Sequence, residues 1–151
     1  MKTFQPILQF RDPHQWVLLL RVLTSIPMVW FLSRWMEISN LLKYLDQPAK
    51  NRNPLGPDEI EQAKFIWNYA HFILVKCLQV KNPCFLRSLL LFWILRGKGL
   101  ESKIYFGVKK RGSPLEGHSW ISLNGKFLLE ESDPQLTYID IFAYPYEGKT
   151  P

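Results

Sequence analysis

Hydrophobic and polar positions divide the chain into a helix-like first two thirds and a strand-like last third. Up to Gly99, apolar residues recur at spacings of three and four or fill whole stretches, as they do in helices. From residue 102 they alternate over short segments that turn residues separate, which is typical of antiparallel strands. This order predicts an α+β fold in which helices precede a small antiparallel sheet.

The first third of the chain is strongly apolar and is expected to form two helices. Proline suits the first turn of a helix, so Asp12-Pro13 can open the first one. Pro27 lacks the N–H that a helix interior needs and is expected to end or kink this helix at Ile26. A second helix is predicted from Met28 to Leu45. Its expected buried side consists of Trp30, Trp35, Ile38 and Leu42.

Residues 16–32, WVLLLRVLTSIPMVWFL, have the composition of a membrane segment. The stretch has seventeen residues and Arg21 interrupts it, whereas a bilayer span needs about 20 apolar residues. We therefore expect a buried or partner-facing helix. Peripheral membrane contact by an amphipathic helix is the alternative.

A polar segment with three prolines and one glycine, residues 46–57, is predicted to link this region to the rest of the chain. Helix is expected to resume near Asp58, because acidic residues favour the positive end of a helix dipole. The apolar face of this helix is expected to hold Ile60, Ala63, Trp67, Ala70, Leu74 and Leu78.

The stretch from Phe85 to Leu95 is apolar on all sides, which is typical of a central helix that other elements cover. Gly97 and Gly99 are expected to end it. Asn124-Gly125 is a strong signal for a two-residue hairpin turn. Strands are predicted at residues 103–108, 118–123 and 127–130, and residues 138–142 are expected to form a further short strand or helix.

Length and pattern together predict a single domain over residues 1–151, in which a helical region (1–56) precedes the core (57–151). The formal net charge is +6, and residues 1–56 hold seven Lys/Arg against three Asp/Glu. This excess is too scattered for nucleic-acid binding, which needs a clustered basic face. It is compatible with an acidic partner or an anionic membrane surface.

The chain has two cysteines, Cys77 and Cys84, which are too few for a disulfide framework, and it shows no secretory signal pattern. The expected location is therefore a reducing cytoplasm. The apolar residues 16–32 would in addition allow association with a membrane. The cysteines and histidines lack the paired spacings of a zinc site, so no metal and no cofactor is predicted.

Cys84 follows Pro83 at the expected start of the central helix. Unpaired N–H groups and the dipole at such an end stabilise a thiolate and lower the pKa of a thiol below about 8.5. The same N–H groups can hold a developing oxyanion. The alternative is a buried cysteine that packs as a small hydrophobe, and that interpretation is favoured for Cys77.

His118 opens a predicted strand and is the candidate base for Cys84, because a thiol nucleophile needs a base nearby. Trp120 shares its strand face and is expected to pack near the imidazole. His14 and His71 are expected to be structural or solvated. Arg87, one turn past Cys84, is expected to pair with a carboxylate in the fold, and binding of a substrate carboxylate is the alternative.

The base in turn needs an orienting carboxylate on the strand that pairs with its own. Counting outward from the Asn124-Gly125 turn places Glu131 directly opposite His118 and Glu130 diagonal to it. A bulge would shift this register by one residue. Asp133 is the third candidate, and pairing alone does not choose among them.

A family resemblance covers about residues 80–135 and rests on the segment CFLRSLLLFWILRGKGLESKIYFGVKKRGSPLEGHSWISLNGKFLLEESDP. It resembles the protease part of lasso-peptide biosynthesis B proteins, the family of the microcin-processing leader peptidase. The shared pattern is Cys-x-x-Arg-Ser/Ala-x-x-Leu, Leu-x-x-x-Gly, a Gly-Val strand end, His-Ala/Ser-Trp and an Asn/Asp-Gly turn. The resemblance implies a transglutaminase-like (papain-like) cysteine protease core.

In that family Cys, His and Asp form the catalytic triad, so the resemblance implies Cys84 and His118 as nucleophile and base. The family acid usually lies twelve residues after the histidine, where this chain has Glu130 in place of aspartate. Glu130 is thus the implied third member. Glu131 and Asp133 stay open as alternatives.

The resemblance further implies a cysteine peptidase that removes the leader peptide from a ribosomally made lasso-peptide precursor. Short family members use a separate small leader-recognition protein, and we expect the same here because the predicted elements leave no segment for a recognition domain. The implied partners are the precursor peptide, that recognition protein and the lasso cyclase, with residues 1–56 as a docking region. A transglutaminase-like acyltransferase with an amine acceptor, or a non-catalytic interaction protein of this fold, is the alternative.

Overall fold

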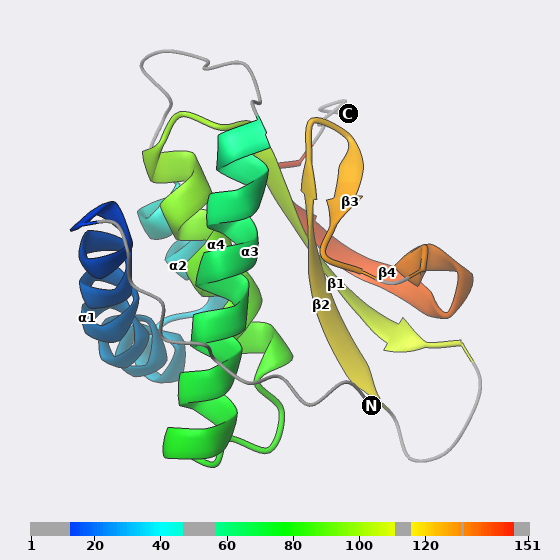
Figure 1. The fold of residues 1–151 in the computed structure, drawn as a ribbon. Helices are drawn as coiled ribbons and strands as arrows, with labels where there is room; N and C mark the ends of the chain where they lie inside the picture. Colours follow the sequence, from blue (N-terminus) through cyan, green and yellow to red (C-terminus); the bar gives the residue numbers. More distant parts are fainter. Residues whose placement is uncertain (1–12, 47–56, 111–115, 131, 147–151) are drawn as a thin grey trace.

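The computed structural model describes residues 13–46, 57–110, 116–130 and 132–146. Figure 1 shows a layer of helices packed against one side of a sheet. Within the described residues the helices are α1 (Pro13–Trp35), α2 (Ile38–Leu45), α3 (Pro57–Phe72) and α4 (Cys84–Gly97), with the short η1 (Ile73–Cys77) and η2 (Pro134–Leu136). The strands are β1 (Ser102–Lys109), β2 (Gly117–Leu123), β3 (Lys126–Leu128) and β4 (Tyr138–Tyr144). The predicted α+β class is therefore confirmed.

Helix α1 continues through Pro27, so the predicted end at Ile26 is wrong, while the alternative, a kink at this point, stays a prediction. Proline removes one helix hydrogen bond, but Pro27 lies on the exposed side of α1, where water can solvate the freed carbonyl. The chain breaks after Trp35 instead, and Glu37 has an extended backbone with φ −62° and ψ 144°. Neither glycine nor proline marks this break, which explains why the sequence pattern missed it.

The predicted buried side of this region is correct only in part. Leu42 of α2 is fully buried, whereas Trp30 and Trp35 of α1 are exposed. Helix α1 instead faces the core with Val22 and Val29. The bulky tryptophans therefore point outward, contrary to expectation.

Helices α3 and α4 form the layer between α1 and the sheet (Figure 1). Ala63, Ala70 and Leu74 are buried as predicted, but Leu78 is exposed. The reason is that α3 passes into η1, a π-helical turn, which holds more residues per turn and rotates the following positions off the face. Helix α4 is buried on most sides, as its sequence predicts.

The sheet has the strand order β3-β2-β1-β4, and each neighbouring pair is antiparallel. Asn124 and Gly125 have φ values of 50° and 77°, the left-handed pair that a two-residue hairpin requires. Residues 138–144 form a strand rather than a helix. Because β4 pairs with β1, the chain must cross the sheet end after β3, and this crossing brings residues 129–130 and 132–137 toward the start of β2.

The two faces of the sheet have different environments. Ile104 and Ile121 face the helices and belong to the main hydrophobic core. The other face carries an aromatic layer in which Tyr105 stacks on Trp120 with ring centroids 5.9 Å apart. Gly107 makes room for this layer, since a Cβ there would lie 2.7 Å from both the Trp120 ring and the Ile139 carbonyl oxygen.

Asp46, at the end of α2, connects the first helical region to the central helix and to the sheet. Its Oδ1 accepts a hydrogen bond from Arg96 Nε of α4 at 2.6 Å, and its Oδ2 accepts one from the Tyr144 hydroxyl of β4 at 3.1 Å. The Asp46 and Arg96 side chains are only 16% and 14% exposed. The predicted linker that follows falls on residues 47–56, which lie outside the described residues.

Candidate active site

Cys84 is the first residue of α4, and it is half-buried. The helix begins at this point because the Pro83 carbonyl accepts its first hydrogen bond, from the Arg87 N–H at 2.9 Å. The backbone N–H groups of Phe85, in the first turn, and of Ser119, on β2, both donate to the Cys84 sulfur. The sulfur thus lies at the positive end of a helix and against the sheet.

Ser88 holds α4, which carries Cys84, against β2, which carries His118. It is fully buried, one turn beyond Cys84, and its Oγ donates to the Ser119 carbonyl at 3.0 Å. Ser119 follows His118 directly, so this bond sets the spacing between the two elements. Sequence reasoning missed Ser88, although a serine inside an otherwise apolar buried helix signals a specific hydrogen bond.

The His118 imidazole contacts both other predicted site residues. It hydrogen bonds with the Cys84 thiol, and its Nε2 lies 3.3 Å from Glu130 Oε2. Since Nε2 faces the carboxylate, Nδ1 is the ring nitrogen left for the sulfur. The ring stacks on both Trp120 and Tyr138, with centroid distances of 5.7 and 5.0 Å, and these two rings also contact each other. Trp120 was expected here, whereas Tyr138 comes from β4 and could not be placed from the sequence.

These contacts shift the pKa values of the two groups in opposite directions. Hydrogen bonding to Cys84 and then to Glu130 raises the pKa of His118 to about 9, although burial acts against this. The hydrogen bond from His118 lowers the pKa of Cys84 more than burial raises it. Both shifts favour a thiolate beside an imidazolium, which is the reactive form of a cysteine nucleophile.

Glu130 reaches His118 because the chain leaves the sheet after β3. The predicted register holds for the three pairs of the β2–β3 ladder, which ends with Ile121 opposite Leu128. Leu129 then adopts a left-handed backbone with φ 64°, which turns the chain away from the ladder. The extrapolated positions opposite β2 therefore do not apply to Glu130.

The other two candidate carboxylates are Glu131 and Asp133. Glu131 lies outside the described residues, so its predicted position opposite His118 is untested. Asp133 precedes η2, and its Oδ1 accepts a hydrogen bond from the Gln135 N–H at 2.9 Å. Asp133 is exposed and acts as a helix cap. Of the described carboxylates, Glu130 is the one within reach of the imidazole.

Arg87 lies beside the site and is held there by α3. Its guanidinium stacks on the Trp67 ring with 3.6 Å between Cζ and the ring centroid, and its Nη1 lies 2.8 Å from His71 Nδ1. Burial lowers the pKa of Arg87, while the charges of Cys84 and Glu130 act in the opposite direction. The guanidinium therefore adds positive potential near the thiolate and the carboxylate.

The contacts of Arg87 differ from those expected. Its guanidinium lies on an aromatic ring and against a histidine, and among the described residues it has no hydrogen bond to a carboxylate. Burial and then the Arg87 charge lower the pKa of His71, so His71 is neutral and its Nδ1 can accept a hydrogen bond from Arg87 Nη1. Trp67 and His71 lie four residues apart on α3, a spacing that places both on one helix face. The sequence shows that Trp67 and His71 share a helix face, but it does not show that this face contacts Arg87.

The remaining sequence candidates lie elsewhere or are not described. Cys77 is exposed on η1, rather than buried as predicted, and the side chain of His14 lies outside the described residues. Among the described residues, no group of three or more His, Cys, Asp or Glu side chains could hold a metal ion.

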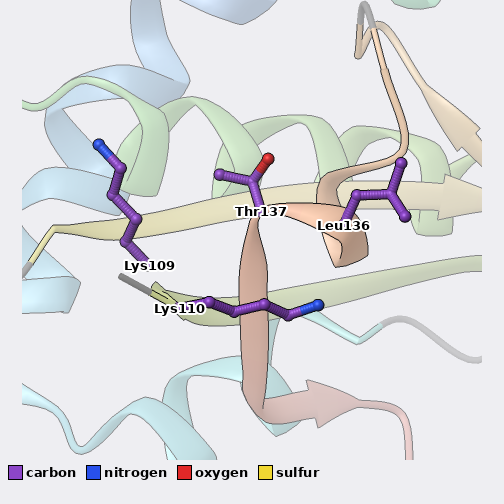
Figure 2. A pocket seen from close by; sticks show the side chains of 4 residues that line it. All are labelled: Lys109, Lys110, Leu136 and Thr137. Atoms are coloured by element: carbon purple, nitrogen blue, oxygen red, sulfur yellow. The ribbon is translucent and has the colours of Figure 1, made fainter. Parts of the chain in front are cut away.

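A surface pocket lies at the end of the sheet near residue 110 (Figure 2). Figure 2 shows its lining side chains Lys109, Lys110, Leu136 and Thr137. Lys109 Nζ contacts Glu116 Oε2 at 2.7 Å, and Lys110 Nζ donates to the Gln135 carbonyl. Lys109 is thus paired with a carboxylate, and none of the three site residues lines the pocket.

Comparison with known proteins identifies a family for this chain. A family model for the transglutaminase-like superfamily matches residues 22–143, a range that includes the sulfur, the imidazole and the carboxylate described above. No curated protein and no solved structure matches the chain significantly.

Proposed function

The chain belongs to the transglutaminase-like superfamily, which includes cysteine peptidases, and from this premise we propose that it is itself a cysteine peptidase. The observation that carries the proposal is the position of His118, which contacts the Cys84 thiol on one side and the Glu130 carboxylate on the other. This is the order nucleophile, base and orienting acid that covalent acyl transfer requires.

In the proposed mechanism the Cys84 thiolate attacks the scissile carbonyl carbon of a peptide bond. Backbone N–H groups at the start of α4 face the oxygen on which negative charge develops. The His118 imidazolium then gives its proton to the leaving amine as the C–N bond breaks. Water, deprotonated by the now neutral His118, attacks the thioester and releases the acid. Glu130 orients the ring through Nε2 and, whenever the imidazole is neutral, keeps its proton on that nitrogen.

The proposed substrate is a ribosomally made lasso-peptide precursor, from which the enzyme removes the leader peptide. The support for this finer assignment is the motif series around Cys84 and His118, including Arg87 and the Asn124-Gly125 turn. A separate leader-recognition protein and a lasso cyclase are the proposed partners.

Incubation with a precursor peptide encoded beside the gene, followed by mass spectrometry, tests the proposal. Cleavage between leader and core is expected with the wild-type chain and its recognition protein. Cys84→Ala should abolish cleavage, because no other group replaces the sulfur. Cys77→Ala is the matched control and should retain it. An inactive Cys77 variant with an active Cys84 variant would contradict the assignment, and a product linked to an amine would identify an acyltransferase.

A further inference from the structure

Helix α1 carries an apolar side that the rest of the described protein leaves uncovered. Its members recur mainly at spacings of three and four, so they form one stripe along the helix. Trp35 is 75% exposed and Phe31 58% exposed. The large exposed side chains of α1 include Val17, Leu20, Leu23, Trp30, Phe31 and Trp35.

The opposite side of α1 is already occupied. Val22, Ile26 and Val29 are buried, and α1 packs against α3 and α4. Figure 1 shows α1 on the outer side of the helix layer, away from the sheet. The exposed stripe therefore faces outward from the molecule, while the inner side holds α1 on the core.

The charge of α1 indicates what can cover the stripe. The helix has 23 residues and no aspartate or glutamate, and its charged residues are Arg21 and Arg34. Tryptophan, phenylalanine and leucine are the apolar side chains that enter the headgroup boundary when a helix lies on a membrane. Exposed arginine without neighbouring acid on the same helix complements anionic lipid headgroups.

A membrane-crossing arrangement is less compatible with the fold. The segment Trp16–Trp35 has 20 residues and a mean hydropathy of 1.7, so its length and composition would allow it to cross a membrane. To do so, α1 would have to leave α3 and α4 and expose the core that Val22, Ile26 and Val29 now cover. Lying flat, it keeps that packing and buries the outer stripe.

We propose that the outer side of α1 docks this protein on the surface of an anionic lipid bilayer, with the helix parallel to the membrane plane. The aromatic and aliphatic side chains enter the headgroup boundary, and Arg34 contacts lipid phosphates.

Cosedimentation of the full chain with vesicles tests this proposal. Vesicles of phosphatidylcholine mixed with phosphatidylglycerol should bind the protein more tightly than phosphatidylcholine alone, and added salt should weaken the binding. The double substitution Trp30→Ser/Phe31→Ser should lower the partition coefficient at least about tenfold, since it removes two large apolar groups from the contact. Ile139→Ser/Ile141→Ser, an exposed apolar pair on β4, is the matched control and should leave binding unchanged.

Both double variants change exposed residues, so equal urea midpoints with wild type will show that they fold. Failure to bind mixed vesicles, or unchanged binding of the α1 variant, would overturn the proposal. Light scattering that reveals an α1-dependent dimer without vesicle binding would assign the stripe to a second copy instead. Resistance of the bound protein to carbonate extraction would indicate a membrane-crossing helix and also overturn flat docking.

Discussion

Glu130 and Asp133 lie three residues apart but have different contacts. The carboxylate of Glu130 meets the His118 ring, whereas that of Asp133 caps a short helix through the Gln135 N–H. A change of either carboxylate to its amide keeps size and shape, so the two substitutions separate an effect on the site from an effect on the fold.

Glu130→Gln should lower the rate of precursor cleavage more than about tenfold, because the neutral amide no longer orients and stabilises the imidazolium. It should also lower the pKa of His118, which Glu130 helps to raise. Asp133→Asn should change neither, since an amide oxygen can still accept the capping hydrogen bond. An NMR titration of His118 in the two variants measures this, and equal pKa values in Glu130→Gln and wild type would contradict the role of Glu130.

At the scale of elements, β1 and β2 hold the imidazole and its aromatic neighbours at a fixed separation. Gly107 in β1 pairs with His118 in β2, and the Trp120 ring fills the space where a Cβ at Gly107 would lie. The strand pairing and the aromatic layer therefore depend on the absence of a side chain at this position.

Gly107→Ala should destabilise the fold by about 1–3 kcal/mol, because the new methyl group forces a buried indole or the backbone of β4 to move. Gly117→Ala is the matched control in β2, where the nearest atom to a Cβ would be 3.9 Å away. Urea unfolding of both variants measures the difference. Equal midpoints for the two alanine variants would show that the Trp120 ring adapts without cost.

The elements themselves were predictable where local signals are strong. The turn at Asn124-Gly125 fixed the register of the β2–β3 ladder, and Pro83 marked the start of α4. The end of α1 was not predictable, since packing against α3 and α4 keeps the helix continuous through Pro27. The position of β4 beside β1 was also hidden, because strand order depends on long-range pairing that no local pattern contains.

The candidate site was predictable to a similar extent. Cys84 and His118 could be selected because each occurs at the start of an element, where a side chain is accessible and the backbone supplies donors. Glu130 could not be chosen from the residues alone, because it reaches His118 only through the left-handed turn at Leu129. Leucine rarely adopts that conformation, so the turn was not expected. Tyr138 joins the imidazole through tertiary packing, which leaves no trace in the order of residues.

At the scale of the whole molecule, Asp46 connects three layers that are distant in sequence. Its partners Arg96 and Tyr144 lie 50 and 98 residues away. This network should couple the N-terminal helices to the core, so that both unfold together in one transition.

Asp46→Ala should lower the free energy of unfolding by about 2–4 kcal/mol, because Arg96 would remain largely buried without its counter-ion. Tyr144→Phe removes only the hydroxyl and should cost about 1 kcal/mol. Urea unfolding followed by circular dichroism and by fluorescence gives both values. Two separate transitions in the wild-type chain would contradict the coupling of the layers.

The account depends most on an ion pair between the Cys84 sulfur and the His118 imidazole. The pH dependence of Cys84 alkylation by iodoacetamide, measured in the Cys77→Ala chain, tests it most directly. Because the pKa of Cys84 is lowered, alkylation should persist below the pH at which an ordinary thiol loses reactivity, and a second change should appear near pH 9, where His118 loses its proton. Adding His118→Ala should return the profile to that of a free thiol. Identical profiles with and without His118 would contradict the ion pair and the peptidase mechanism based on it.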